Sequence, residues 1–314
     1  MKTITAPING LHHITAISSD VIRNRQFYTS VLGLRFVKKS VNQDDTGTYH
    51  LYYGDYTGSP GTIMTFFPWS GLRRGRPGTG QAYATGFSVP ADSLPFWQQR
   101  FVRLKVETLP IERRFADDVL PFLDPDGLRL ELIATAEVDL RAPVPSNDIP
   151  ADKGIRGFHG TTLALVDAAP TATVLTKTMG YRLSEQAAQR SRYTVGSGGP
   201  GAYVDLLTDP ALPRGLNGAG TIHHVAFRVP DDQAHRFARE AISRDGLPVS
   251  PVIDRAYFKS IYYREPGGIL FEVATDQPGF AIDEPVETLG TKLSLPPHLE
   301  NDRMAIEAGL PPIQ

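Results

Sequence analysis

The chain has 314 residues, a formal net charge of -2 and no cysteine. The near-zero charge gives no general attraction to nucleic acid or anionic membranes, and the lack of cysteine excludes disulfides, a catalytic thiol and sulfur-bound zinc. Residues 1–5 lack the apolar core of a signal peptide, and no apolar run approaches the ~20 residues of a membrane span. We therefore expect a cytoplasmic protein with no nucleic-acid or membrane partner, and two domains at this length.

Four strand-like segments open similar units at intervals of roughly 65 to 75 residues along the chain. In the first unit, residues 21–31 are helical in pattern and end at Gly33, a left-handed cap before the next strand. The third unit repeats this arrangement at residues 175–179 and Gly180. Each unit is therefore predicted to contain a strand, a helix and three further strands. The four opening strands are residues 12–18, 84–90, 159–166 and 223–230.

The second and fourth units also share turn sequences, DPDG at residues 124–127 and EPGG at 265–268, each of which leads into a strand. A unit of this kind leaves one sheet face uncovered, so units should pair and curl their sheets around a shared cleft. We predict an α+β fold of four βαβββ modules. The modules lie at about residues 8–70, 80–137, 155–209 and 220–275.

The proline-rich segment 141–150 separates the four modules into two pairs and predicts a domain boundary. The expected domains are residues 1–150 and 151–314. The second carries a C-terminal arm, residues 276–314, which we expect to wrap and dock on the protein, with a short helix at residues 300–308.

Glu272 is the most informative residue, because it is a carboxylate inside an apolar strand, residues 268–274. Such a carboxylate must be protonated, paired or bound to a cation. Two pairs of adjacent histidines, at residues 12–13 and 223–224, each open an apolar strand. Two imidazoles and one carboxylate are the ligand set of a redox-active non-heme iron site.

Adjacent side chains on a strand point to opposite faces, so one histidine of each pair should bind the metal. A lone histidine is more often a satisfied core or surface group, but two matched pairs in repeated units favour ligands. His159 occupies the equivalent place in the third unit, so a set with His224 and Glu272 stays open. We rank it below a set built on His13, because the pairing of units decides between them.

The second unit is not expected to hold a complete site, since it opens with Tyr83-Ala84-Thr85. Glu131 shares a strand face with Arg129, which predicts a half-solvated strand and a surface or ion-paired carboxylate. The basic segment 71–78 lacks phosphate-loop spacing and is predicted to be a mobile surface loop.

Four segments together resemble ring-cleaving dioxygenases of the vicinal oxygen chelate (glyoxalase/bleomycin-resistance) superfamily, and the resemblance extends over nearly the whole chain. The branch that is most similar contains the hydroquinone and chlorohydroquinone dioxygenases. The segments are GLHHITA at 10–16, FYTSVLGLR at 27–35, TYHLYYGD at 48–55 and GTIMTFFPW at 61–69.

The resemblance implies two tandem glyoxalase-like domains with curled mixed sheets around a metal cleft, and Fe(II) held jointly by the first and last modules. Mn(II) stays open as an alternative metal. The implied ligands are His13, His224 and Glu272, with His12 and His223 beside the site. The pocket residues implied by the resemblance are Thr15, Arg255 and Tyr262.

We therefore expect an enzyme of aromatic degradation that opens a hydroquinone-type ring with O2. His223 or Tyr262 would move the proton and Arg255 would stabilise negative charge. A catechol extradiol dioxygenase, a glyoxalase-like isomerase and a non-catalytic aromatic-binding protein stay open, although the isomerase needs a second buried carboxylate. The exact substrate, the pathway and a homodimer also stay open. Aromatic residues that could wall the pocket are Phe66, Phe67, Trp69, Tyr257 and Phe258.

Overall fold

The computed structural model describes residues 6–313, and all four modules have the predicted order of strand, helix and three strands. The first contains β1 (Leu11–Ser18), α1 (Val21–Gln26), β2 (Arg35–Asn42), β3 (Asp45–Gly54) and β4 (Ile63–Pro68). The second contains β5 (Gln81–Pro90), α2 (Leu94–Leu104), β6 (Glu112–Arg114), β7 (Asp117–Leu123) and β8 (Arg129–Thr135).

The second half of the chain repeats the arrangement. The third module contains β9 (Gly157–Ala164), α3 (Ala169–Thr173), β10 (Arg182–Ala187), β11 (Arg190–Thr194) and β12 (Tyr203–Leu207). The fourth contains β13 (Thr221–Val229), α4 (Asp232–Arg244), β14 (Ile253–Asp254), β15 (Phe258–Arg264) and β16 (Leu270–Pro278). Within residues 6–313, no helix is long and apolar enough to cross a membrane.

The first helix shows how local sequence sets these elements. The Asp20 carboxylate accepts hydrogen bonds from the N–H groups of Ile22 and Arg23, and so caps α1. The helix continues as a π-helical turn, Phe27–Val31, and stops at Gly33 as predicted. Gly33 has φ +72°, and a Cβ there would lie 2.5 Å from Cδ1 of Ile149. Only glycine fits this turn without strain.

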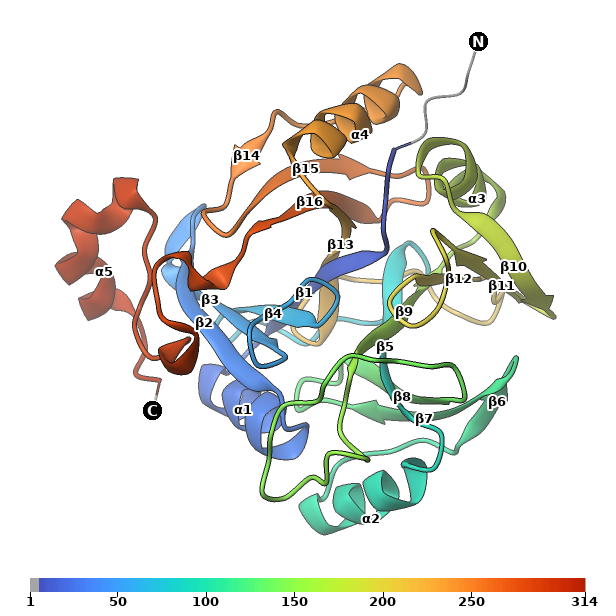
Figure 1. Cartoon of the computed structure of the whole chain (residues 1–314), viewed down its shortest axis with the longest axis horizontal. Coiled ribbons are helices and arrows are strands. Elements are labelled where there is room, and N and C mark those ends of the chain that lie inside the picture. The colour runs from blue at the N-terminus through green and yellow to red at the C-terminus, as the bar shows by residue number, and fades with distance from the viewer. Residues whose placement is uncertain (1–5, 314) are drawn as a thin grey trace.

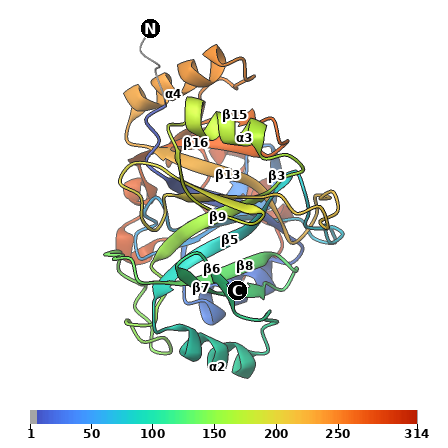
Figure 2. The same ribbon diagram turned by 90° about the vertical axis from the view of Figure 1, so that its right-hand side faces the viewer.

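The modules assemble into two eight-stranded sheets (Figures 1 and 2), and the predicted α+β architecture is confirmed. The first sheet has the order β14-β15-β16-β13-β1-β4-β3-β2 and joins the first module to the fourth. The second has the order β10-β11-β12-β9-β5-β8-β7-β6 and joins the middle two modules. Each sheet therefore takes one module from either side of residue 150, and the division into residues 1–150 and 151–314 stays a prediction.

The basic segment 71–78 is largely exposed, as predicted for a surface loop, but backbone hydrogen bonds tie it to residues 213–219. Gly75 N–H donates to the carbonyl of Ala219 at 2.8 Å, and Arg76 N–H donates to that of Leu216 at 2.9 Å.

The C-terminal arm crosses the outside of β2 and β3 (Figure 1), as the expectation of a docking tail requires. Ser294 N–H donates to the carbonyl of Lys39 at 2.9 Å, and the Tyr49 hydroxyl donates to that of Pro311 at 2.9 Å. The arm ends in α5 (Arg303–Gly309), close to the predicted helix, after three short 3-10 turns. Those turns are Phe280–Ile282, Val286–Thr288 and Pro297–Asp302.

Candidate metal centre

Strand register brings three predicted ligands together on the concave face of the first sheet. Ala226 on β13 lies opposite His13 on β1 and opposite Glu272 on β16. His224 is two residues before Ala226 and shares its face, while the small alanine leaves space between the flanking side chains. Nε2 of His13 lies 3.2 Å and Nε2 of His224 lies 2.9 Å from Oε2 of Glu272. The three ligand atoms lie within 4.8 Å of one another.

The hydrogen bonding of Glu272 fits a bound cation. The residue has no solvent exposure, and its Oε1 accepts a hydrogen bond from the Ser260 hydroxyl. Its Oε2 is buried without a hydrogen-bond partner. A buried carboxylate oxygen with no donor is costly, and two imidazole nitrogens beside it complete a set that suits a divalent metal. Burial lowers the pKa of His224, which favours the neutral imidazole that a metal requires.

The adjacent residue, His12, orients the His13 ring through a hydrogen bond. Nε2 of His12 lies 3.2 Å from the carbonyl of Thr275, to which it must donate. Burial lowers the pKa of His12 well below its usual range, so its Nδ1 is an acceptor. His13 Nδ1–H then donates to it at 2.9 Å, which leaves the lone pair of His13 Nε2 directed at Glu272. His12 does not line the cavity described below.

The second pair repeats the contact, with Nδ1 of His223 2.8 Å from Nδ1 of His224. If His224 presents its Nε2 lone pair to a metal, its Nδ1–H donates to His223. The remaining Nε2–H of His223 is then available to the cavity, which His223 lines as an exposed residue.

The structure does not bring His159 to this centre. It lies on β9 in the second sheet, where its Nε2 is 3.6 Å from Oδ2 of Asp117 and has no hydrogen-bond partner. Modules one and four pair, so His13 rather than His159 faces His224 and Glu272. Within residues 6–313, His13, His224 and Glu272 form the one group of histidine and acidic side chains close enough to share a metal.

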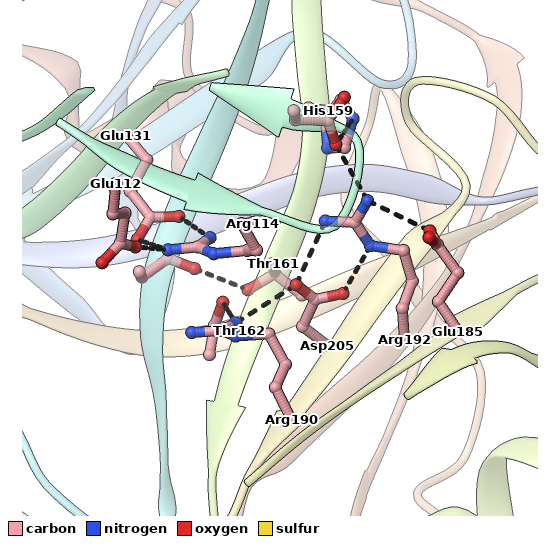
Figure 3. Close-up of polar contacts among 12 residues, drawn as sticks. Glu112, Arg114, Glu131, His159, Thr161, Thr162, Glu185, Arg190, Arg192 and Asp205 are labelled. Carbon is pink, nitrogen blue, oxygen red and sulfur yellow. Dashed lines mark hydrogen bonds and ion pairs between the residues drawn. The ribbon is translucent and has the colours of Figure 1, made fainter. Parts of the chain in front are cut away.

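At the equivalent position of the second sheet, the positive charge beside the buried carboxylate comes from arginine side chains (Figure 3). Arg114 donates to both carboxylate oxygens of Glu131, at 2.6 and 2.9 Å, and Arg192 donates to Asp205 at 2.9 Å. Glu131 is 2% exposed, and the prediction of a half-solvated strand is wrong because this pairing lets both faces of β8 be buried. The expectation of an ion-paired carboxylate holds.

A cavity of about 370 Å³ is lined by two of the candidate ligands, His13 and His224. Its polar groups include Arg255 and Tyr262, as expected, and Arg255 Nε donates to the Tyr262 hydroxyl at 3.3 Å. Among the aromatic residues considered beforehand, Phe66 lies instead in the main core. The aromatic walls come from Phe67, Trp69, Tyr257 and Phe258, together with Tyr52 and His50.

Thr15 shares a strand face with His13, but it does not line the cavity as expected. It is fully buried, and its hydroxyl lies 2.8 Å from that of Thr65 on β4. His50 and Tyr52 on β3 were missed from the sequence although both line the cavity. Their spacing of two residues placed them on one strand face, but no pattern indicated that this face meets the metal ligands.

Comparisons with known proteins match most of the chain. The model of the Glyoxalase/Bleomycin resistance protein/Dioxygenase superfamily matches residues 10–132 and 157–273. A Bacillus subtilis protein provisionally named ring-cleaving dioxygenase MhqO is 44% identical over 305 residues, 97% of this chain and 96% of that protein. The chlorohydroquinone/hydroquinone 1,2-dioxygenase of Sphingobium indicum is 31% identical over 311 residues, 96% of this chain and 95% of the relative.

Solved structures also match most or nearly all of the chain. A Bacillus subtilis protein provisionally described as a dioxygenase has a TM-score of 0.94 at 43% identity, over 99% of both chains. Glyoxalase I from Zea mays has a TM-score of 0.63 at 14% identity, over 85% of this chain and 92% of that chain, and shares the fold alone.

Proposed function

Because the chain belongs to the glyoxalase/bleomycin resistance protein/dioxygenase superfamily, we propose that it is an Fe(II)-dependent dioxygenase that opens the ring of a hydroquinone-type diol with O2. One observation carries the proposal. Oε2 of Glu272 is buried without a hydrogen-bond partner, beside Nε2 of His13 and His224, at the base of an aromatic-walled cavity.

Ferrous iron held by these three residues would supply neighbouring open positions for a phenolate and dioxygen, whereas a closed structural site would supply none. The protein's own contribution is to orient the ligands and enclose the substrate. His12 holds the His13 ring through Nδ1, and Ser260 holds the second oxygen of Glu272. We therefore propose His12 as a positioning residue, because its other nitrogen is occupied by the Thr275 carbonyl.

Tyr262 and Arg255 support proton handling and charge stabilisation beside the ligands. Tyr262 lies opposite Glu272 in the strand register, and its ring centroid is 5.8 Å from that of His224. Burial raises the pKa of Tyr262, so its hydroxyl stays protonated. Because that hydroxyl accepts from Arg255, it can use its own proton as a donor, and a substrate oxygen in the cavity is one acceptor within the proposal. The Arg255 guanidinium can stabilise negative charge that develops on the ring.

The test is oxygen uptake by Fe(II)-loaded protein with hydroquinone, methylhydroquinone and catechol, with ring-opened product followed by absorbance. We expect uptake with the para-diols and little with catechol. Uptake with catechol alone would indicate an extradiol dioxygenase, and no uptake with any of the three would favour an isomerase or a binding protein.

Two matched variants test the ligand assignment. Glu272→Gln should lower bound iron and turnover more than about tenfold, because it removes the one anionic ligand. Glu131→Gln changes the equivalent carboxylate of the second sheet, and we expect it to retain iron. Full iron and turnover in Glu272→Gln would contradict the assignment.

A further inference from the structure

A row of hydrogen-bonding side chains crosses the first sheet from the metal ligands to the far wall of the cavity. Thr15 on β1 lies opposite His224 on one side and opposite Thr65 on the other, and Thr65 lies opposite Tyr52 on β3. These residues therefore form one cross-sheet row, with a metal ligand at one end and a tyrosine at the other.

His50 links Tyr52 to this row. The Tyr52 hydroxyl lies 2.7 Å from Nδ1 of His50, and Nε2 of His50 lies 2.9 Å from the Thr65 hydroxyl. Thr65 in turn contacts Thr15 at 2.8 Å between hydroxyl oxygens. Both nitrogens of His50 are thus engaged, while Tyr52 has further hydrogen-bonding capacity at its oxygen.

The donors and acceptors along this row of hydrogen bonds can be arranged in either direction. Burial lowers the pKa of His50 well below its usual range and raises that of Tyr52, so the imidazole is neutral and the phenol protonated. A neutral imidazole donates at one nitrogen and accepts at the other, and threonine hydroxyls can rotate to match. Tyr52 can therefore accept a hydrogen bond from a ligand hydroxyl or donate one to it.

The position of Tyr52 differs from that of the other tyrosine in the cavity. Tyr262 lies beside Glu272 on β15, at the ligand side. Tyr52 lies on β3, three strand spacings from His224, which is about 14 Å along the sheet, and the two residues line the same cavity. A ring with hydroxyls at opposite ends can place one at the metal ligands and direct the other toward β3. The adjacent hydroxyls of a catechol both point to one side.

We propose that the Tyr52 hydroxyl, oriented by His50, forms a hydrogen bond with the hydroxyl of a para-diol that points away from the metal ligands. This pair then selects para-diols over phenols with a single hydroxyl. The inference rests on the proposed function and names a specificity group for it. The aromatic rings around the pair hold it in place, because His50 packs on Phe67 at 4.5 Å and Tyr52 packs on Phe280 at 5.2 Å between centroids.

The experiment measures binding without turnover. Fe(II)-loaded protein under argon is titrated calorimetrically with hydroquinone and, separately, with phenol, which lacks the second hydroxyl. Tyr52→Phe removes only the hydroxyl and keeps the ring packing. Tyr53→Phe is the matched control, since Tyr53 is the next residue, points to the other face and donates to Asn24 at 2.9 Å.

For Tyr52→Phe we expect a hydroquinone Kd about tenfold higher, the effect of one lost hydrogen bond, with a phenol Kd unchanged. Tyr53→Phe should leave both constants unchanged. A second variant, His50→Gln, keeps the Tyr52 hydroxyl but alters its partner. It should raise the Kd for hydroquinone by a smaller factor and leave the Kd for phenol unchanged.

Two results would overturn the inference. One is hydroquinone affinity in Tyr52→Phe and His50→Gln equal to that of the wild type. The other is an equal loss of phenol affinity, which would mean that the pair only shapes the cavity. Wild-type protein that binds hydroquinone but consumes no O2 would instead contradict the proposed function, so the two failures are distinguishable.

Discussion

At the scale of single residues, the two sheets carry a buried carboxylate at equivalent positions, and the surroundings of the two carboxylates differ. Glu272 on β16 has an oxygen without a hydrogen-bond donor beside two imidazoles. Glu131 on β8 forms a two-pronged ion pair with Arg114. The position of Glu272 therefore suits a metal ion, whereas the carboxylate of Glu131 is already neutralised by arginine.

The ion pair of Glu131 predicts a pH dependence of stability. Burial alone would raise its pKa, but the adjacent guanidinium outweighs burial and lowers the pKa of Glu131 from 4.5 to about 2. Because the folded-state pKa is the lower one, the pair stabilises the fold above about pH 4.5, and this contribution is lost as pH falls from 4.5 to 2. The full loss is of order 3 kcal/mol.

Denaturant unfolding of the wild type and Glu131→Gln at several pH values checks this prediction. The variant should be less stable at pH 6, and its deficit should shrink as the pH falls below 4.5. A deficit that is the same at pH 6 and pH 3 would show that the carboxylate charge contributes nothing.

At the scale of elements, patterns that depend on neighbours in sequence were predictable. The stop of the first helix at Gly33 follows from a local φ requirement, and the four modules follow from repeated turn signals. The alternation of Arg129 and Glu131 with leucines was misleading, since it is the same for a solvated face and for a face whose charges are paired internally. Arg114, the partner of Glu131, lies on another strand and carries no signal of that contact.

The C-terminal arm is held against β2 by a buried lysine and contacts a residue that lines the cavity. Lys38 on β2 has no solvent exposure, and its Nζ lies 2.5 Å from Oε2 of Glu284 and 2.7 Å from Oδ1 of Asp283. Asp283 also accepts from the Tyr257 hydroxyl at 2.9 Å. Phe280 of the arm stacks on Tyr257 at 4.9 Å, and Tyr257 lines the cavity.

Weakening this contact should therefore affect both the arm and the cavity. We expect Glu284→Gln to destabilise the protein by about 3 kcal/mol, because it breaks a buried ion pair, and to raise the KM for hydroquinone. Limited proteolysis should cut the arm faster. Arg303→Ala is the control on the arm itself, since its ion pairs with Glu300 and Glu307 are largely exposed and contribute little, and within residues 6–313 it otherwise donates only to the carbonyl of Leu293 in the arm. An arm that stays protected with an unchanged KM would contradict the prediction.

At the scale of the whole molecule, the pairing of modules decided what sequence could not. His13 and His159 occupy equivalent strand positions, and only the joining of β1 to β13 makes the first a partner of His224. Sequence patterns along the chain record each module but not its distant neighbour. The ligand residues were thus identifiable as candidates, while their assembly, and the roles of Thr15 and His50, depended on strands far apart in sequence.

The same pairing predicts where metal removal acts. The candidate metal ligands lie on β1, β13 and β16 in the first sheet, whereas the centre of the second sheet holds arginine and carboxylate groups (Figure 3). Binding only to the folded state stabilises it, and removal leaves Glu272 buried without its cation. After chelation, we expect hydrogen exchange to increase in peptides of β1, β13 and β16 and to stay unchanged in those of β5, β8 and β9. Hydrogen-exchange mass spectrometry of loaded and chelated protein measures this contrast, and an equal increase in both sheets would show that the two are not stabilised separately.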